Sequence, residues 1–259
     1  NPNVNSKILK EIEHEFEMVS NKKVWLSEAS ELARMNWWTI EYGLVGDLSN
    51  PKIYGAGLLS SISESVSCLK NNVKKIPISL DCIKQDYNIT KPQPQLFVTE
   101  SFKGLKKILT NYSRTMAYVA GGKPAVEKAI LSKNTTTTVF DSGLQVSGVL
   151  NKCIYDKKNQ PSYLNYLGRT QLCYKNSEID GHGTVTHPEG YGAALGNIVP
   201  LNKSLYELSN EELKTINVEP GKHSIIKFYN GLIVSGTINS IIKFEGKPIL
   251  ITLENASVR

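Results

Sequence analysis

The stretch from Asn36 to Leu44 is the feature that most constrains how this chain can fold. It reads as the end of a helix with two apolar faces, one formed by Ala29, Leu32, Ala33, Trp37 and Ile40 and the other by Met35, Trp38 and Tyr42. A helix that is apolar on nearly every side is expected to be buried, because a surface helix normally keeps one polar face. Gly43 follows the apolar run and is read as the stop signal of this helix.

Glu41 stands near the end of this apolar helix, where an ionised carboxylate is costly unless its charge is compensated. The sequence leaves the form of compensation open. A cation, a hydrogen-bond network or a metal ion could pair with the carboxylate, or the side chain could reach water at the helix end. Glu41 is therefore a candidate metal ligand, with a solvated or ion-paired glutamate as the alternative.

A second motif, Gly55-Ala56-Gly57, follows about a dozen residues later, and its small residues would let another backbone approach closely. The spacing of Leu58, Ile62, Val66 and Leu69 predicts one helix from Leu58 to about Leu69. Ser60 and Ser61 fall on its first turn. Their hydroxyl groups could reach a ligand or cap the free N–H groups of the turn.

The character of the sequence changes at Gly121-Gly122-Lys123-Pro124, which predicts a domain boundary. The local patterns predict these elements: helices over 6–19, 101–112 and 209–216, a loop over 46–54, strands near 96–98, 135–139 and 144–149, and a hairpin over 231–253. The predicted fold class is α+β. It has a mainly helical first domain, residues 1–122, and a mostly-β second domain, residues 123–259.

Composition excludes several classes of protein. No apolar run approaches the roughly 18–20 residues that a membrane-spanning helix needs. The net charge of +6 comes from dispersed lysines, without the basic runs and interleaved aromatic residues expected of a nucleic-acid-binding protein. The 4 cysteines form no Cys-x-x-Cys pair, which is typical of a reducing, cytoplasmic setting.

Two histidines stand close together in the second domain, in the segment from Asp180 to His187, and Glu189 follows them. His182 and His187 would point to opposite faces of a strand, because their spacing is odd. In a glycine-rich loop they could instead converge on a metal ion together with Glu189. The alternative is a polar turn with surface histidines. The lone His14 of the first domain lacks clustered partners and is not predicted to bind metal.

Three segments of the first domain resemble motifs of the aromatic amino acid hydroxylases, in the order of that family and at nearly its spacing. They are Trp37-Trp38-Thr39-Ile40-Glu41-Tyr42-Gly43-Leu44, then Tyr54-Gly55-Ala56-Gly57-Leu58-Leu59-Ser60-Ser61, then Gln93-Pro94 with Val98-Thr99-Glu100-Ser101-Phe102. The similarity is greatest to the phenylalanine hydroxylase branch. It spans roughly residues 25–110 and does not reach the second domain.

The resemblance implies an enzyme that hydroxylates an aromatic amino acid with molecular oxygen, non-haem Fe(II) and tetrahydrobiopterin. It implies Glu41 as the carboxylate ligand of the iron, Trp37 as part of the substrate pocket, and Ala33 as a position beside the pterin. Gly57, Ser60 and Ser61 would border the amino-acid end of the substrate. Asn36 stands where the family often has tyrosine.

The family's two iron-binding histidines lie in a His-x-x-x-x-His motif upstream of the glutamate, and no such motif precedes Glu41 here. We therefore expect this sequence to be the C-terminal part of a bacterial-type hydroxylase, inactive alone because it lacks both histidines. A rival hypothesis is a non-catalytic binding or regulatory module, in which the β domain carries the ligand or partner site.

Overall fold

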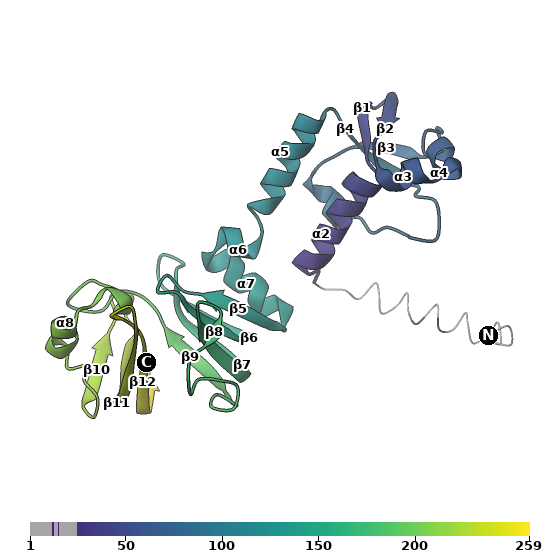
Figure 1. Cartoon of the computed structure of the whole chain (residues 1–259). Helices are drawn as coiled ribbons and strands as arrows, with labels where there is room; N and C mark the ends of the chain where they lie inside the picture. Colours follow the sequence, from purple (N-terminus) through teal and green to yellow (C-terminus); the bar gives the residue numbers. More distant parts are fainter. Residues whose placement is uncertain (1–11, 13–14, 16–24) are drawn as a thin grey trace. The chain divides into compact units, whose positions relative to one another are not determined.

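The computed structural model describes Ile12, Glu15 and residues 25–259. The predicted helix over 6–19, including His14, lies almost wholly outside this part of the chain. The described residues fall into two compact units that divide between Val119 and Ala120, and each is considered by itself. Figure 1 draws the first unit in purple to teal and the second in teal to yellow.

The first unit contains a four-stranded sheet and several short helices. Its strands are β1 (Leu44–Asp47), β2 (Asn50–Ile53), β3 (Lys74–Pro77) and β4 (Gln95–Thr99). Its helical elements are α2 (Glu28–Asn36), η1 (Trp37–Glu41), α3 (Ala56–Ser60), α4 (Ile62–Ser67), η2 (Leu80–Lys84), α5 (Phe102–Ser113) and α6 (Ala117–Ala120), the last of which crosses the division between the units. The strand order is β2-β1-β4-β3, with β1 antiparallel to β2 and β4 parallel to both β1 and β3.

Serine caps fix the starts of two helices in this unit. Ser27 Oγ accepts a hydrogen bond from Ser30 N at 3.1 Å, at the start of α2. Ser101 Oγ accepts one from Gly104 N at 3.1 Å, at the start of α5. Helix α5 then reaches back to α2, because Tyr112 Oη donates to Glu28 O at 3.3 Å.

The prediction that α2 and η1 are buried on nearly every side is wrong. Met35 and Trp38 are each only 1% exposed, and Trp38 Nε1 donates to Gln85 O at 3.0 Å. Leu32 and Ile40, on the other face, are 49% and 50% exposed. The sheet and the segment around η2 pack against the face of Met35 and Trp38. On the other face, among the residues that the structure describes, Trp37 is covered by its stack on Tyr87, whereas Leu32 and Ile40 stay exposed.

Two further local predictions are wrong. The segment 46–54 is a hairpin rather than a loop, because Asp47 Oδ1 accepts from Ser49 N at 2.8 Å and closes a tight turn between β1 and β2. The single helix from Leu58 to Leu69 is two helices, since Ser61 is extended (φ −119°, ψ 114°). Ile62 is then 89% exposed instead of buried.

The second unit is mostly β. One sheet contains β5 (Thr135–Val139), β6 (Leu144–Tyr155), β7 (Pro161–Tyr174), β8 (Ser177–Glu178) and β9 (Gly190–Ala194), and the other contains β10 (His223–Lys227), β11 (Ile233–Phe244) and β12 (Lys247–Val258). The predicted hairpin is the β11–β12 pair. Three helical elements accompany the sheets: α7 (Gly122–Ser132), which the sequence did not predict, η3 (Leu205–Glu207) and α8 (Asn210–Thr215).

Strand β7 organises the first of these sheets. It pairs with β6 along nearly its whole length, and with β8 and β9 near its two ends. The sheets share packing, because Ile249 and Leu250 of β12 join the same buried cluster as Leu164 of β7. The fold is therefore a mixed α+β architecture with several sheets. None of the helices in the described part of the chain is long and apolar enough to cross a membrane.

Candidate functional site

Glu41 lies on a turn of π-helix rather than at the end of an ordinary α-helix. The N–H of Tyr42 donates to the carbonyl of Trp37, five residues back, at 2.9 Å. Single π-turns are rare and are frequently found at functional sites, because they redirect one side chain without breaking the helix. Glu41 is half-buried, and among the described residues no hydrogen bond or ion pair engages its carboxylate.

Glycines bring the two motifs around Glu41 into contact. A Cβ on Gly55 would lie 2.4 Å from Glu41 O, and a Cβ on Gly57 would lie 3.1 Å from Glu41 Oε2. Gly43 is needed for the same reason, since its Cβ would lie 2.2 Å from Thr39 O. The predicted close backbone approach at Gly55 and Gly57 is therefore present, and its partner is the turn that carries Glu41.

Ser60 and Ser61 lie just after Gly57, where the chain leaves α3 and enters α4. Ser60 Oγ donates to Gly57 O at 2.9 Å, and Ser61 Oγ accepts from Glu64 N at 3.4 Å as the cap of α4. Ser61 thus performs the capping role that the sequence left open. The neighbouring side chains of Leu59 and Ile62 are 62% and 89% exposed, so the segment beyond Gly57 presents an apolar surface.

Trp37 is held in an aromatic stack. Its ring lies 4.5 Å from that of Tyr42 at 17° and 4.3 Å from that of Tyr87 at 10°. The indole Nε1 is buried and has no hydrogen-bond partner among the residues that the structure describes. The stack fixes the indole plane beside the turn of Glu41. The contact of Tyr87 with Trp37 joins segments 50 residues apart, and Tyr87 was not singled out from the sequence.

Ala33 lies one helical turn before Trp37, and its side chain is exposed. It belongs to the face of α2 that also exposes Leu32 and Ile40. A small side chain at Ala33 leaves room for a flat ligand, but it offers no polar group that would select one.

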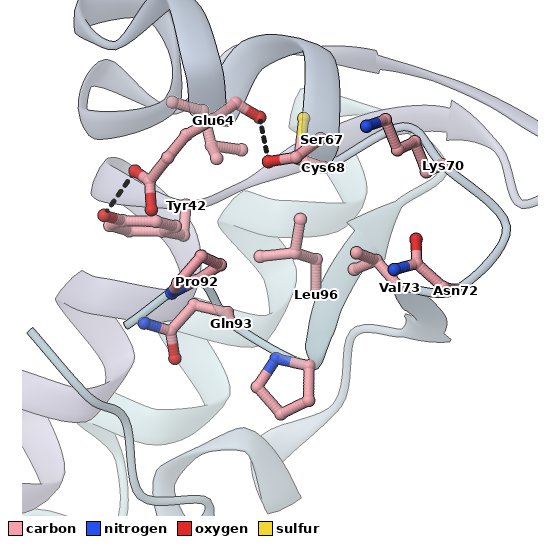
Figure 2. A pocket seen from close by; sticks show the side chains of 12 residues that line it. Tyr42, Glu64, Ser67, Cys68, Lys70, Asn72, Val73, Pro92, Gln93 and Leu96 are labelled. Carbon is pink, nitrogen blue, oxygen red and sulfur yellow. Dashed lines mark hydrogen bonds between the residues drawn. The ribbon is translucent and has the colours of Figure 1, made fainter. Parts of the chain in front are cut away.

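A cavity of about 370 Å³ lies beside Tyr42, and Figure 2 shows the side chains that line it. Tyr42 Oη donates to Glu64 Oε2 at 2.8 Å across its mouth, and buried Leu58 and Leu96 contribute apolar wall. Burial, together with the hydrogen bond to Glu64 and the charges of Glu64 and Glu41, raises the pKa of Tyr42 to about 12. Glu41 itself does not line this cavity.

The wall of the cavity includes Gln93, one of the residues of the third motif. Gln93 is only 6% exposed, and its side chain binds the backbone of the segment before it. Gln93 Nε2 donates to Lys91 O at 3.2 Å, and Gln93 Oε1 accepts from Asn88 N at 3.4 Å. The Gln-Pro motif therefore closes a loop over the cavity.

The described residues do not by themselves fit an iron site. A facial iron centre needs two histidines and one carboxylate. Over Ile12, Glu15 and residues 25–259, no group of three His, Cys, Asp or Glu side chains is placed to hold a metal ion. The first unit contributes Glu41 alone, and its one histidine, His14, lies outside the described residues.

The two histidines of the second unit converge, although they do not gather a third donor. His182 Nδ1 lies 3.0 Å from His187 Nε2, and the two rings stack at 5.2 Å. Glu189 is exposed, and no metal-binding group of three includes it within the described residues. The two imidazoles thus converge, but the predicted set of His182, His187 and Glu189 is not assembled within the described residues.

Comparison with known proteins places the first unit beside one enzyme family. Residues 20–120 match the model of the biopterin-dependent aromatic amino acid hydroxylases. Phenylalanine-4-hydroxylase of Bos taurus is 40% identical over 87 residues, which is 33% of this chain and 19% of that protein. The Chromobacterium violaceum enzyme is 42% identical over 76 residues (29% of this chain, 26% of that protein), and tryptophan 5-hydroxylase of Xenopus laevis is 35% identical over 108 residues (40% and 22%).

A solved structure of the Chromobacterium violaceum phenylalanine hydroxylase, with iron and phenylalanine bound, is 34% identical and aligns with a TM-score of 0.30. The alignment covers 33% of this chain and 35% of that one. The chain thus spans between 19% and 26% of the length of the curated relatives named above.

Proposed function

We propose that this chain, whose residues 20–120 belong to the aromatic amino acid hydroxylase family, supplies the carboxylate side of the active site of a pterin-dependent aromatic amino acid monooxygenase. The substrate would be an aromatic amino acid, with phenylalanine favoured because phenylalanine hydroxylases predominate among the relatives. Molecular oxygen would be the second substrate. Four free thiols suit a reducing, cytoplasmic setting.

One observation carries this proposal: the Glu41 carboxylate lies against Gly57. The 3.1 Å between Oε2 and a Cβ built at Gly57 means that the two family motifs meet at the carboxylate itself. The π-turn aims Glu41 toward this contact, and the stack on Tyr87 fixes Trp37 beside it. These features form one wall of a binding site.

In the proposed site Glu41 is one ligand of the iron, and Trp37 lines the pocket for the aromatic ring of the substrate. Gly57, Ser60 and Ser61 border the amino-acid end, and Ala33 lies beside the pterin. Iron and pterin, when bound, would supply the oxygen-activating chemistry. The residues described here keep the wall apolar and hold the carboxylate in place, but they provide one donor where a facial site requires three.

The test is phenylalanine hydroxylation by the complete gene product, with Glu41→Gln compared with Glu64→Gln. Both side chains are half-buried glutamates of the same unit, but Glu64 is engaged by Tyr42. Loss of a metal ligand should cost more than the roughly 10- to 100-fold that residues outside the ligand set contribute to metal affinity or activity. Tyrosine formation should therefore fall more than about 100-fold in Glu41→Gln, and much less in Glu64→Gln. Equal activities of Glu41→Gln and the parent would refute the ligand role.

Calorimetric titration of this chain with Fe(II) at pH 7 tests the expected incompleteness of the site. We expect weak binding, because one carboxylate is a poor ligand set. Tight binding that Glu41→Gln abolishes would show that donors outside the described residues complete the site. Tight binding that survives in Glu41→Gln would place the metal elsewhere in the chain.

A further inference from the structure

The loop from Asp180 to Glu189 links β8 to β9 and runs along the edge of β7 between them. The carbonyls of both histidines are bound to this edge. Leu172 N donates to His182 O at 2.9 Å, and Thr170 N donates to His187 O at 3.0 Å. Leu172 and Thr170, two positions apart on β7, therefore fix the backbone positions of both histidines.

The interior of the loop is also ordered by hydrogen bonds. His182 N donates to Ile179 O at 2.8 Å, and His187 N donates to Gly183 O at 3.2 Å. The second of these bonds closes a turn that carries Val185 outward, where it is 91% exposed. The loop thus brings two residues five positions apart onto the same side, which a strand would not do.

This backbone arrangement brings one ring nitrogen of His182 close to one ring nitrogen of His187. His182 Nδ1 and His187 Nε2 are 3.0 Å apart, and the edge of His187 meets Tyr191 with 5.7 Å between ring centroids. A hydrogen bond at this distance requires a proton on one nitrogen and a lone pair on the other. Two nitrogens that each lie about 2.1 Å from one metal ion are about 3.0 Å apart at the right angle of square-planar copper, and about 3.4 Å apart at the tetrahedral angle of zinc. A cation can therefore replace the shared proton with little movement of either ring.

The surroundings of the loop add a negative charge. The Glu178 carboxylate lies beside the loop, since a Cβ on Gly183 would be 2.7 Å from its Oε1. Gln171 Nε2 holds the other oxygen of this carboxylate.

We propose that His182 and His187 form a two-histidine binding site for a late first-row divalent metal ion such as Zn²⁺ or Cu²⁺. Imidazole nitrogen suits these ions, whereas Mg²⁺ and Ca²⁺ prefer oxygen ligands. Water or an external ligand fills the remaining coordination positions. The site belongs to the second unit and is independent of Glu41.

The experiment is calorimetric titration of the full chain with ZnCl₂ at pH 7.5, with His182→Gln and His187→Gln as test variants. His223→Gln is the matched control, because His223 is an exposed histidine on β10 in the same unit. We expect the binding of one equivalent of Zn²⁺ to weaken about 10-fold or more in each test variant and to be unchanged in the control. MgCl₂ should give no binding.

A second measurement uses the unaltered chain, so that its result does not depend on whether the variants fold. Imidazole ¹⁵N resonances, followed during Zn²⁺ addition, should shift at His182 Nδ1 and His187 Nε2 and stay constant at His223. Zinc should also raise the midpoint of thermal unfolding as its concentration rises, because it binds the folded state. The proposal is overturned if no Zn²⁺ binds, if both test variants bind as the parent does, or if binding depends on a cysteine instead.

Discussion

The carboxylate of Glu41 and the backbone of Gly57 lie so close that a single added carbon at Gly57 would sit 3.1 Å from Oε2. The neighbouring Gly55 meets the backbone of the same turn even more tightly. This contact joins a helix end to the segment that follows a hairpin, and it depends on residues without side chains. A methyl group added at either glycine should therefore disturb this contact.

Gly55→Ala should destabilise the first unit by about 1–3 kcal/mol, the usual cost of forcing an extra carbon into a packed interior. The new Cβ would lie 2.4 Å from Glu41 O and 2.6 Å from Gly43 N, and both are backbone atoms that cannot rotate away. Gly104→Ala is the control, because its Cβ would meet only Ser101 Oγ at 3.5 Å and Thr99 Oγ1 at 3.6 Å. In helix α5 that change should stabilise by about 0.5–1 kcal/mol. Urea unfolding of both variants measures whether the two changes in the free energy of unfolding have opposite signs.

Tyr87→Leu should lower the free energy of unfolding of the first unit by about 1–2 kcal/mol, since aromatic pairs contribute about 0.5–1.5 kcal/mol beyond their buried area. The change removes the stack on Trp37 and the edge contact with Trp38, whose ring centroid is 6.4 Å away. Tryptophan emission should shift to longer wavelength as Trp37 becomes more exposed. Tyr118→Leu, at a side chain that is 81% exposed, should change neither quantity.

Leu58→Ala should cost about 2–5 kcal/mol, whereas Ile62→Ala should change stability by less than about 0.5 kcal/mol. The two residues are four positions apart and would share one face of a continuous helix. The break at Ser61 instead leaves Leu58 1% exposed and Ile62 89% exposed. Thermal unfolding of the two variants separates these arrangements. Similar losses of stability in the two variants would instead support one continuous helix.

Stability should fall as the pH rises from 10 toward 12. Burial is the first cause that raises the pKa to about 12 for Tyr42, Tyr54, Tyr155 and Tyr166. Because these folded-state pKa values exceed the value of about 10 in the unfolded chain, the stabilisation is complete below pH 10 and is lost as the pH passes through 12. Absorbance of the phenolate should show these tyrosines titrating late in the folded chain and near pH 10 in guanidinium chloride. Titration of all 12 tyrosines near pH 10 in the folded chain would contradict this prediction.

The elements that could be predicted from sequence are those with a local chemical signal. Ser27, Ser101 and Ser209 each begin a helix with a side-chain cap, and Ser209 pairs with Glu212 in a capping box. The hairpin predicted over 231–253 is the β11–β12 pair, whose turn at Glu245 and Gly246 lies between strands rich in β-branched residues. In each case the signal and the structure occupy the same few residues.

The elements that were missed depend on contacts between distant segments, or on residues that fit both a loop and a helix or strand. Pro51 was read as a loop residue, but it is compatible with β2 because that strand lies at the edge of the sheet. Gly121 to Pro124 were read as a domain boundary, and α7 was not predicted there, yet Gly122 and Pro124 lie in the first turn of this helix, where a missing N–H costs nothing. The stack of Trp37 on Tyr87 has no local signal at all.

The candidate site was predictable only in part. The motif resemblance singled out Glu41, Gly57, Ser60 and Ser61, but the residues alone did not indicate that Glu41 and Gly57 touch. The π-turn at Glu41 could not be predicted, since its pattern of apolar residues also fits an α-helix. For His182 and His187 the odd spacing left two outcomes, and the hydrogen bonds of the loop to β7 decided between them.

The order of strands in the first unit, β2-β1-β4-β3, places Pro51 and Pro77 on the two outer strands. A proline has no N–H to donate, so the border of each outer strand lacks one donor for any further strand that might add to it. Such interruption matters most for a unit that presents apolar side chains such as Ile62 and Leu59 to solvent. Both outer strands thus carry protection against edge-to-edge aggregation.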